Sequence, residues 1–221
     1  MLAERTLLPT AYCGPVDYYS WLVNTPVALE AYGHYERQTF ANRCRIMTAG
    51  GPLDLSIPVE KPASDTPMKE VKIAWNTDWA TLHFRAIESA YSSSPYFMYF
   101  REELLALYQS HPTHLMAWNN LLQNKILSWL AFEELDVVST DHYEKGGNLK
   151  NDMRSCLHPK KKCVPLHAHC MDAYHQVFQQ RFGFVERLSI LDMVFNIGRE
   201  ARLYLLENNK IINNKTNNYD K

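Results

Sequence analysis

The chain has 221 residues, of which 46% are hydrophobic and 12% aromatic, so it can bury a substantial core and fold as one domain. Lysine and arginine total 23 against 24 for aspartate and glutamate, and a net charge of -1 offers no positive field to hold a phosphate backbone. Nucleic acid is therefore excluded as an expected partner.

The N-terminal segment reads as a strand, a helix and a second strand. Residues 5–12 favour a strand, residues 16–22 a helix and residues 27–32 a strand, which is typical of two parallel strands joined by a crossover. Charged residues and a proline interrupt the opening before any long apolar run. We therefore expect neither a signal peptide nor a membrane span, and we expect a cytoplasmic protein.

A hairpin is predicted next along the chain. Residues 43–48 and 53–59 flank the sequence Ala-Gly-Gly-Pro, which is a strong turn signal between two strands. Residues 61–67 are polar and contain prolines, so they are expected to form a surface loop. Apolar residues alternate with lysines over residues 69–74, which indicates a half-exposed edge strand.

From residue 79 the apolar spacing changes to three and four, which predicts helices over residues 79–91, 97–108 and 115–130. Residues 137–140 then read as a strand. The polar segment 141–162 is expected to be a mobile surface loop that closes over a pocket.

The C-terminal part is predicted to be mainly helical. Helices are expected over residues 173–182, 190–196 and 199–208, and the asparagine-rich residues 209–221 are expected to be a disordered tail. We predict an α/β fold, with a mixed sheet from the N-terminal half and a helical C-terminal half, in a single domain over residues 1–208.

Five strings in the chain together resemble the WbqC-like protein family in their order and spacing. The strings are LPTAYCGPVDYYSWL, YERQTFANRCRI, LSIPVEK, DWATLHFRAIESAYSSSPYF and RFGFVERLSILDMVFN. The residues that match the family pattern are Tyr12, Gly14, Pro15, Tyr18, Tyr19, Asn42, Arg43, Cys44, Trp79, His83, Tyr91 and Pro95. The resemblance extends over roughly residues 5 to 206.

The resemblance implies a bacterial protein associated with O-antigen and lipopolysaccharide biosynthesis. It implies a transferase that adds glycine or another acyl group to an amino sugar, with a small-molecule or sugar substrate. Two alternatives stay open: a non-catalytic sugar-binding or nucleotide-sugar-binding protein, and a structural partner of another enzyme of the pathway. A homodimer is one expected assembly, and neither the residues nor the resemblance identifies a cofactor.

Polar and aromatic residues of three segments are predicted to converge on one pocket. His83 and Tyr91 are the candidate catalytic residues. The candidate substrate-binding residues are Tyr12, Tyr18, Asn42, Arg43 and Trp79.

Each of the two leading candidates also has a structural interpretation. Arg43 follows an amide at a strand start and suits a carboxylate, phosphate or sugar hydroxyl, but it can equally pair with an acid such as Glu30. His83 shares a helix face with Trp79 and suits a general base near a stacked sugar ring, or it is a core histidine whose hydrogen bonds are satisfied.

Three further motifs carry weaker functional interpretations. Cys44 suits an acyl-transfer nucleophile only if its pKa is lowered, and buried thiols are common. Gly14 lies where a strand meets a helix start, which attracts anions, but the chain has no phosphate-binding signature there. Ser189 and Asp192 have the spacing of a helix capping box.

A cysteine- and histidine-rich segment follows the helices. It contains Cys156, His158, Cys163, His167, His169 and Cys170. The spacing fits no standard zinc motif and lysines are interleaved, so we predict no metal site. We expect the five cysteines to be free thiols.

Overall fold

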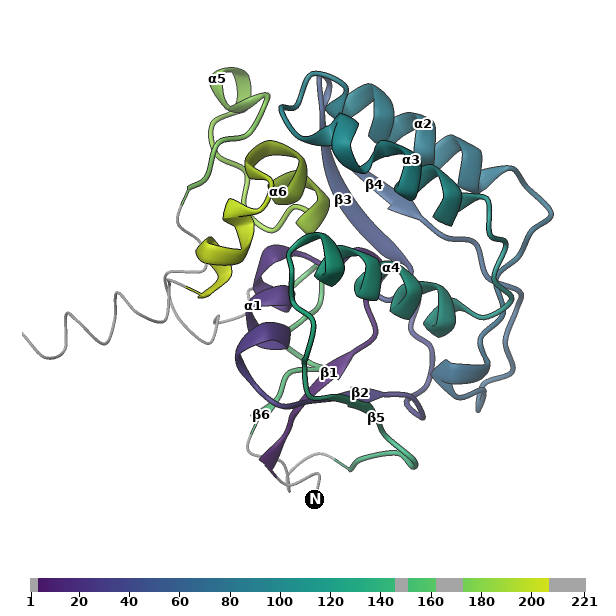
Figure 1. Ribbon diagram of the computed structural model, residues 1–221. Helices are drawn as coiled ribbons and strands as arrows, with labels where there is room; N and C mark the ends of the chain where they lie inside the picture. The colour runs from purple at the N-terminus through teal and green to yellow at the C-terminus, as the bar shows by residue number, and fades with distance from the viewer. Residues whose placement is uncertain (1–3, 146–150, 162–172, 207–221) are drawn as a thin grey trace, which may run out of the picture.

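The computed structural model describes residues 4–145, 151–161 and 173–206 (Figure 1). A parallel sheet forms one side of the molecule, and its strand order is β5-β2-β1-β6. The strands are β1 (Thr6–Pro9), β2 (Val27–Glu30), β5 (Val137–Ser139) and β6 (Asn151–Asp152), and all neighbours in the sheet are parallel. Helix α1 (Val16–Asn24) connects β1 to β2, which confirms the predicted parallel unit.

The remaining elements form a second, mainly helical layer next to an antiparallel hairpin. The hairpin is β3 (Arg43–Thr48) and β4 (Gly51–Ser56), and it is followed by the short 3-10 helix η2 (Met68–Glu70). The helices are α2 (Trp79–Tyr91), α3 (Phe97–Tyr108), α4 (Leu115–Trp129), α5 (Gln179–Phe182) and α6 (Ile190–Ile197). In Figure 1, α1 and α4 lie on the same side of the parallel sheet, and α2 and α3 lie beside the hairpin.

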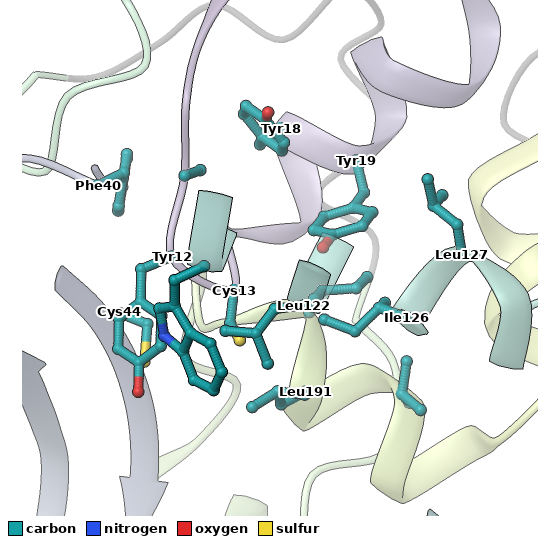
Figure 2. Close-up of a cluster of buried hydrophobic side chains, with 14 of the residues drawn as sticks. Tyr12, Cys13, Tyr18, Tyr19, Phe40, Cys44, Leu122, Ile126, Leu127 and Leu191 are labelled. Carbon is teal, nitrogen blue, oxygen red and sulfur yellow. The ribbon is translucent and has the colours of Figure 1, made fainter. Parts of the chain in front are cut away.

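One continuous cluster of buried side chains joins these layers, and it extends from Leu8 to Leu205. Figure 2 shows Tyr12 and Cys44 from the N-terminal segments close to Leu122 of α4 and Leu191 of α6. Helix α6 is buried on nearly every side, since its hydrophobic residues pack against α1, α3 and β3. The core is therefore rich in aromatic rings with polar tips, each of which needs a hydrogen-bond partner.

The α/β class is confirmed, but the sheet does not come from the N-terminal half alone. Strands β5 and β6 come from the second half, and β6 lies within the segment 141–162 that was expected to be only a loop. This happens because β1 has a free edge that a distant segment can pair with. The predicted domain limit at residue 208 and the tail 209–221 lie outside the described residues.

Two predicted elements are wrong. Residues 69–74 do not form a strand; η2 occupies their start, and Ile73 makes only an isolated bridge to Val59. Alternating apolar residues show which side chains point inward, but they do not show whether a neighbouring strand is present to form backbone hydrogen bonds. The predicted helix 173–182 is reduced to α5, because Gln176 holds Val185 through two hydrogen bonds of 2.9 Å and keeps this part of the chain in a loop.

Within the described residues, none of the helices combines the length and the apolar content that a bilayer crossing requires.

The predicted capping box at α6 is half confirmed. Ser189 is the N-cap, and its hydroxyl accepts a hydrogen bond of 3.3 Å from the Leu191 amide. Asp192 does not complete the box. Its carboxylate accepts hydrogen bonds from the Tyr91 hydroxyl at 2.9 Å and the Tyr174 hydroxyl at 2.7 Å. Burial raises the pKa of Asp192 to about 6, against the lowering effect of these two hydroxyls.

We expect Asp192→Asn to flatten the pH dependence of stability. Because the folded-state pKa is raised above the ordinary 3.8, the stabilising contribution of Asp192 is complete below about pH 4 and is lost as the pH rises through about 6. The difference in free energy of unfolding between wild type and Asp192→Asn should therefore change by about 3 kcal/mol across this window. Urea unfolding at pH 4 and pH 7 measures it, and parallel profiles for the two proteins would contradict it.

Candidate functional site

A cleft of about 420 Å³ opens where three parallel strands end. It is lined by Thr10 after β1, by Glu30 at the end of β2 and by Asp152 at the end of β6. From β1 the chain continues to β2, which lies on one side of β1, whereas β6 lies on the other side of β1. The cleft therefore lies where the strand order reverses. Open α/β sheets bind ligands at this position, because the connecting loops diverge and leave a crevice.

The floor of the cleft is an ion-pair network centred on Arg154. The distance from Arg154 Nη1 to Glu30 Oε2 is 2.8 Å, and Arg154 Nη2 lies 2.6 Å from Asp152 Oδ2. Arg154 Nε also donates to Asp152 Oδ1 at 3.0 Å. Two carboxylates from β2 and β6 therefore share one guanidinium across the end of β1.

The loop after β2 fixes the Glu30 carboxylate. Glu30 Oε1 accepts hydrogen bonds from the amides of Tyr32 at 2.9 Å and Gly33 at 3.1 Å. The Thr140 hydroxyl donates to the same oxygen at 3.2 Å, from the residue that follows β5. The side chain is only 5% exposed, so its orientation is set by the backbone around it rather than by solvent.

Arg154 also determines the ionisation of its neighbour. Burial works to raise the pKa of Asp152, but the hydrogen bonds and the charge of Arg154 outweigh it, and the pKa lies below its ordinary value. Asp152 is therefore an anion at neutral pH. Tyr143 forms part of the cleft wall, and its ring lies 5.2 Å from the Arg154 guanidinium carbon.

The opposite wall is held by Arg187. This side chain forms an ion pair of 3.1 Å with the buried Asp17, lies over the Phe40 ring at 5.3 Å and donates to the carbonyl of Lys161 at 2.5 Å. His158 and Lys161 both line the cleft. The His158 Nδ1 accepts a hydrogen bond of 3.1 Å from the Lys160 amide, so neutral His158 carries its proton on Nε2 and presents a donor.

None of the seven residues predicted from the sequence lines this cleft. The structure does bring Tyr12, Trp79 and His83 together in the core. The Tyr12 hydroxyl lies 2.9 Å from His83 Nδ1 and 2.5 Å from the Tyr108 hydroxyl, and the Trp79 and His83 rings are 5.2 Å apart. Burial lowers the pKa of His83 to about 4, so the imidazole is neutral at physiological pH.

The other predicted site residues lie elsewhere. Tyr91 is bound to Asp192, the Tyr18 hydroxyl donates to Gln123 Oε1 at 3.0 Å, and Asn42 Nδ2 donates to the Ile57 carbonyl at 3.2 Å. The catalytic roles of His83 and Tyr91 and the binding roles of the other five stay predictions.

The structural interpretation, in which Arg43 pairs with an acid, is confirmed, but the acid is Asp54 rather than Glu30. Arg43 forms an ion pair of 3.3 Å with Asp54 across the hairpin, since the antiparallel register brings both side chains to one face. Among the described residues, no hydrogen bond or ion pair joins Arg43 to His83.

The weaker motifs are placed as follows. Burial raises the pKa of Cys44 well above its ordinary value, which opposes a thiolate nucleophile. The start of α1 is not open to an anion, because Val16, Asp17 and Tyr18 are buried and the α6 segment lies against this end, where the Ile190 amide donates to the Gly14 carbonyl at 2.9 Å. Within the ranges the structure covers, no group of three metal-binding side chains occurs. Four of the six cysteines and histidines named above, at positions 163, 167, 169 and 170, lie outside the described residues.

Glu30, Asp152 and Arg154 were missed by the sequence analysis. A usable signal was present, because Glu30 lies in the second half of a strand predicted over residues 27–32, and acids toward the carboxyl ends of parallel strands meet at one edge. No such signal marked Arg154, because the two-residue strand that precedes it has no periodicity of its own.

The fold and the cleft define the class: an α/β protein with a charged cleft at the carboxyl ends of its parallel strands. The model of the WbqC-like protein family matches residues 22–164, and the chain belongs to this family. The chain is 28% identical over 193 residues to the uncharacterized protein Rv1507c of Mycobacterium tuberculosis. The match covers 77% of this chain and 83% of that protein. No solved structure matches.

Arg154→Ala should destabilise the fold by about 3–5 kcal/mol, because it leaves the buried Glu30 carboxylate without its cation. The double variant Glu30→Gln with Arg154→Ala should recover a large part of this loss, since the buried side chain at position 30 is then neutral and only the partly exposed Asp152 lacks its cation. Chemical denaturation of the two variants and wild type at pH 7 checks the expectation. Equal stability of the single variant and wild type would mean that the ion pair does not hold the cleft floor.

The His83 imidazole should titrate near pH 4 rather than near its ordinary 6.5. With a depressed folded-state pKa, the contribution of neutral His83 to stability is present above about pH 6.5 and is lost as the pH falls through about 4. Following the ring carbon and nitrogen shifts by NMR from pH 7 down to about pH 3, on both sides of the expected midpoint, gives its value. A midpoint above pH 6 would show that the ring is solvated.

Proposed function

We propose that this protein is a cytoplasmic transferase of surface-polysaccharide synthesis, which binds an amino sugar in the cleft and adds a glycyl or other acyl group to its nitrogen. The observation that carries the proposal is the sharing of one guanidinium, that of Arg154, by the carboxylates of Glu30 and Asp152. The reaction type rests on the family resemblance, and the substrate class rests on the charge of the cleft.

The charge of the cleft favours a cationic group on the ligand. Three carboxylates, from Glu30, Glu36 and Asp152, line the cleft against the cations of Arg154 and Lys161. The Asp152 carboxylate stays ionised because its pKa is lowered. An ammonium group that approaches the floor therefore gains a charge-assisted hydrogen bond in a partly desolvated site.

The walls suit a sugar ring. Phe40 and Tyr143 supply apolar ring surface, and the hydroxyls of Thr10 and Ser155 supply exchangeable donors and acceptors. A volume of about 420 Å³ lies in the range that small-molecule sites occupy.

The residues present suit acyl transfer to an amine. The bound ammonium group first loses one proton to solvent. The neutral amine nitrogen then forms a bond to the carbonyl carbon of the acyl donor, and the bond from that carbon to its leaving group breaks, with the electron pair departing on the leaving group. The amine proton passes to His34, whose exposed imidazole lines the cleft. The Nε2–H of His158 donates to the carbonyl oxygen as charge develops on it.

Calorimetric titration with glucosamine, glucose and N-acetylglucosamine tests the substrate class. Glucosamine should bind at least about tenfold more tightly than the two sugars that have no ammonium group, since one charge-assisted hydrogen bond is worth that much. Asp152→Asn should remove the preference while keeping an acceptor for Arg154. Asp65→Asn, which changes an exposed acid outside the cleft, is the matched control and should leave the preference intact.

Incubation of the protein with glucosamine and acetyl-coenzyme A or a glycyl thioester tests the reaction, with mass spectrometry of the sugar as the readout. An acylated product whose formation is slowed by Asp152→Asn supports the transferase. Ammonium-dependent binding without any product favours the non-catalytic sugar-binding alternative. Equal binding of all three sugars contradicts the proposal.

A further inference from the structure

A second cleft, of about 540 Å³, lies between α4 and the edge strand β5. It shares no lining residue with the first cleft. The two clefts meet β2 at neighbouring residues. Leu29 lines the second cleft and Glu30 lines the first, and successive side chains of a strand point to opposite faces of the sheet. The second cleft is therefore a separate feature on the α4 side of the sheet.

The helix wall of this cleft is a stripe of polar side chains. Asn120, Gln123, Asn124 and Ser128 recur at helical spacing along α4 and all line the cleft. A helix that covers a sheet normally turns an apolar stripe toward it. Here the side turned toward the edge strand carries three amides and a hydroxyl, which is more hydrogen-bonding capacity than packing requires.

One of these amides is buried and held in a fixed orientation. Gln123 is only 5% exposed, and its Oε1 accepts a hydrogen bond of 3.0 Å from the buried Tyr18 hydroxyl. Its carbonyl oxygen is thereby engaged by the core, which leaves the NH₂ group as the part of this lining side chain that is available to the cleft. Tyr18 thus acts as a positioning residue for Gln123, which gives a physical role to a residue that the sequence marked only as a candidate.

Apart from Glu133, the rest of the lining is apolar or neutral. Leu29, Leu127, Phe132 and Val137 form apolar surface, and Ser139 at the end of β5 adds a hydroxyl. Glu133 is the one charged residue among the described residues that line this cleft. The surface therefore offers paired donors and acceptors over an apolar floor and has little charge to attract an ion.

We infer that this cleft is a binding site for a neutral saccharide unit. Sugar hydroxyls are donors and acceptors at once, which matches amide side chains that present NH₂ and carbonyl groups side by side. The apolar C–H face of a sugar ring fits against Phe132 and the leucines. The inference stands on this cleft alone, and it does not require the proposed reaction in the first cleft.

Methyl glucoside, methyl galactoside and N-acetylglucosamine are suitable probes, each titrated to about 100 mM against isotope-labelled protein. The side-chain NH₂ signals of Asn120, Gln123 and Asn124 should shift saturably with at least one of them. Asn124→Ala should weaken that binding about tenfold, as expected for the loss of a hydrogen-bonding amide. Gln109→Ala, which removes an exposed amide outside the cleft, is the matched control and should bind as wild type does.

Tyr18→Phe separates positioning from packing. It keeps the buried ring but releases Gln123, so binding should weaken several-fold and the Gln123 NH₂ signals should broaden or split in the free protein. A merely structural Tyr18 would leave those signals unchanged. Absence of saturable shifts at the three amides with all probes, or shifts confined to other regions, would overturn the inference. Failure here leaves the amino-sugar test of the first cleft unaffected, because the two sites share no residue.

Discussion

The ion pair between Glu30 and Arg154 ties together parts of the chain that are 124 positions apart. Glu30 ends β2, and Arg154 follows β6, the short strand on the far side of β1. Strand β6 has only two residues, and its ladder alone offers few hydrogen bonds. The buried carboxylate needs a cation, and this requirement fixes the 151–161 segment against the sheet and gives the first cleft its floor.

Buried polar groups impose the same kind of constraint on the core. The Tyr12 hydroxyl forms hydrogen bonds with His83 and Tyr108. The hydroxyls of Tyr91 and Tyr174 donate hydrogen bonds to the Asp192 carboxylate. Each of these groups would cost free energy if it were buried alone, so the elements that carry them must meet in one arrangement. Polar residues of a kind that can catalyse reactions can therefore match a family pattern because they stabilise the core. Such a match does not by itself show that they contact a ligand.

The two clefts differ in the chemistry they present, although both adjoin β2. Charge dominates the first, where carboxylates and cations meet at strand ends that diverge. Neutral amides dominate the second, where a helix faces an edge strand across a gap. The amino-sugar site and the saccharide site that we propose thus meet β2 at neighbouring residues but share no lining residue.

The sequence by itself determined the local structure wherever a periodic pattern met a clear boundary. The parallel unit of β1, α1 and β2, the hairpin, and α2, α3 and α4 all follow from apolar spacing and turn residues. The sequence also placed Glu30 within a predicted strand over residues 27–32. Only the tertiary structure decided that Arg154 lies beside Glu30 and that Tyr18 orients Gln123. The physical reason is that periodicity reports which face of an element is buried, whereas these pairs depend on which distant elements become neighbours, and that is settled by the packing of the whole core.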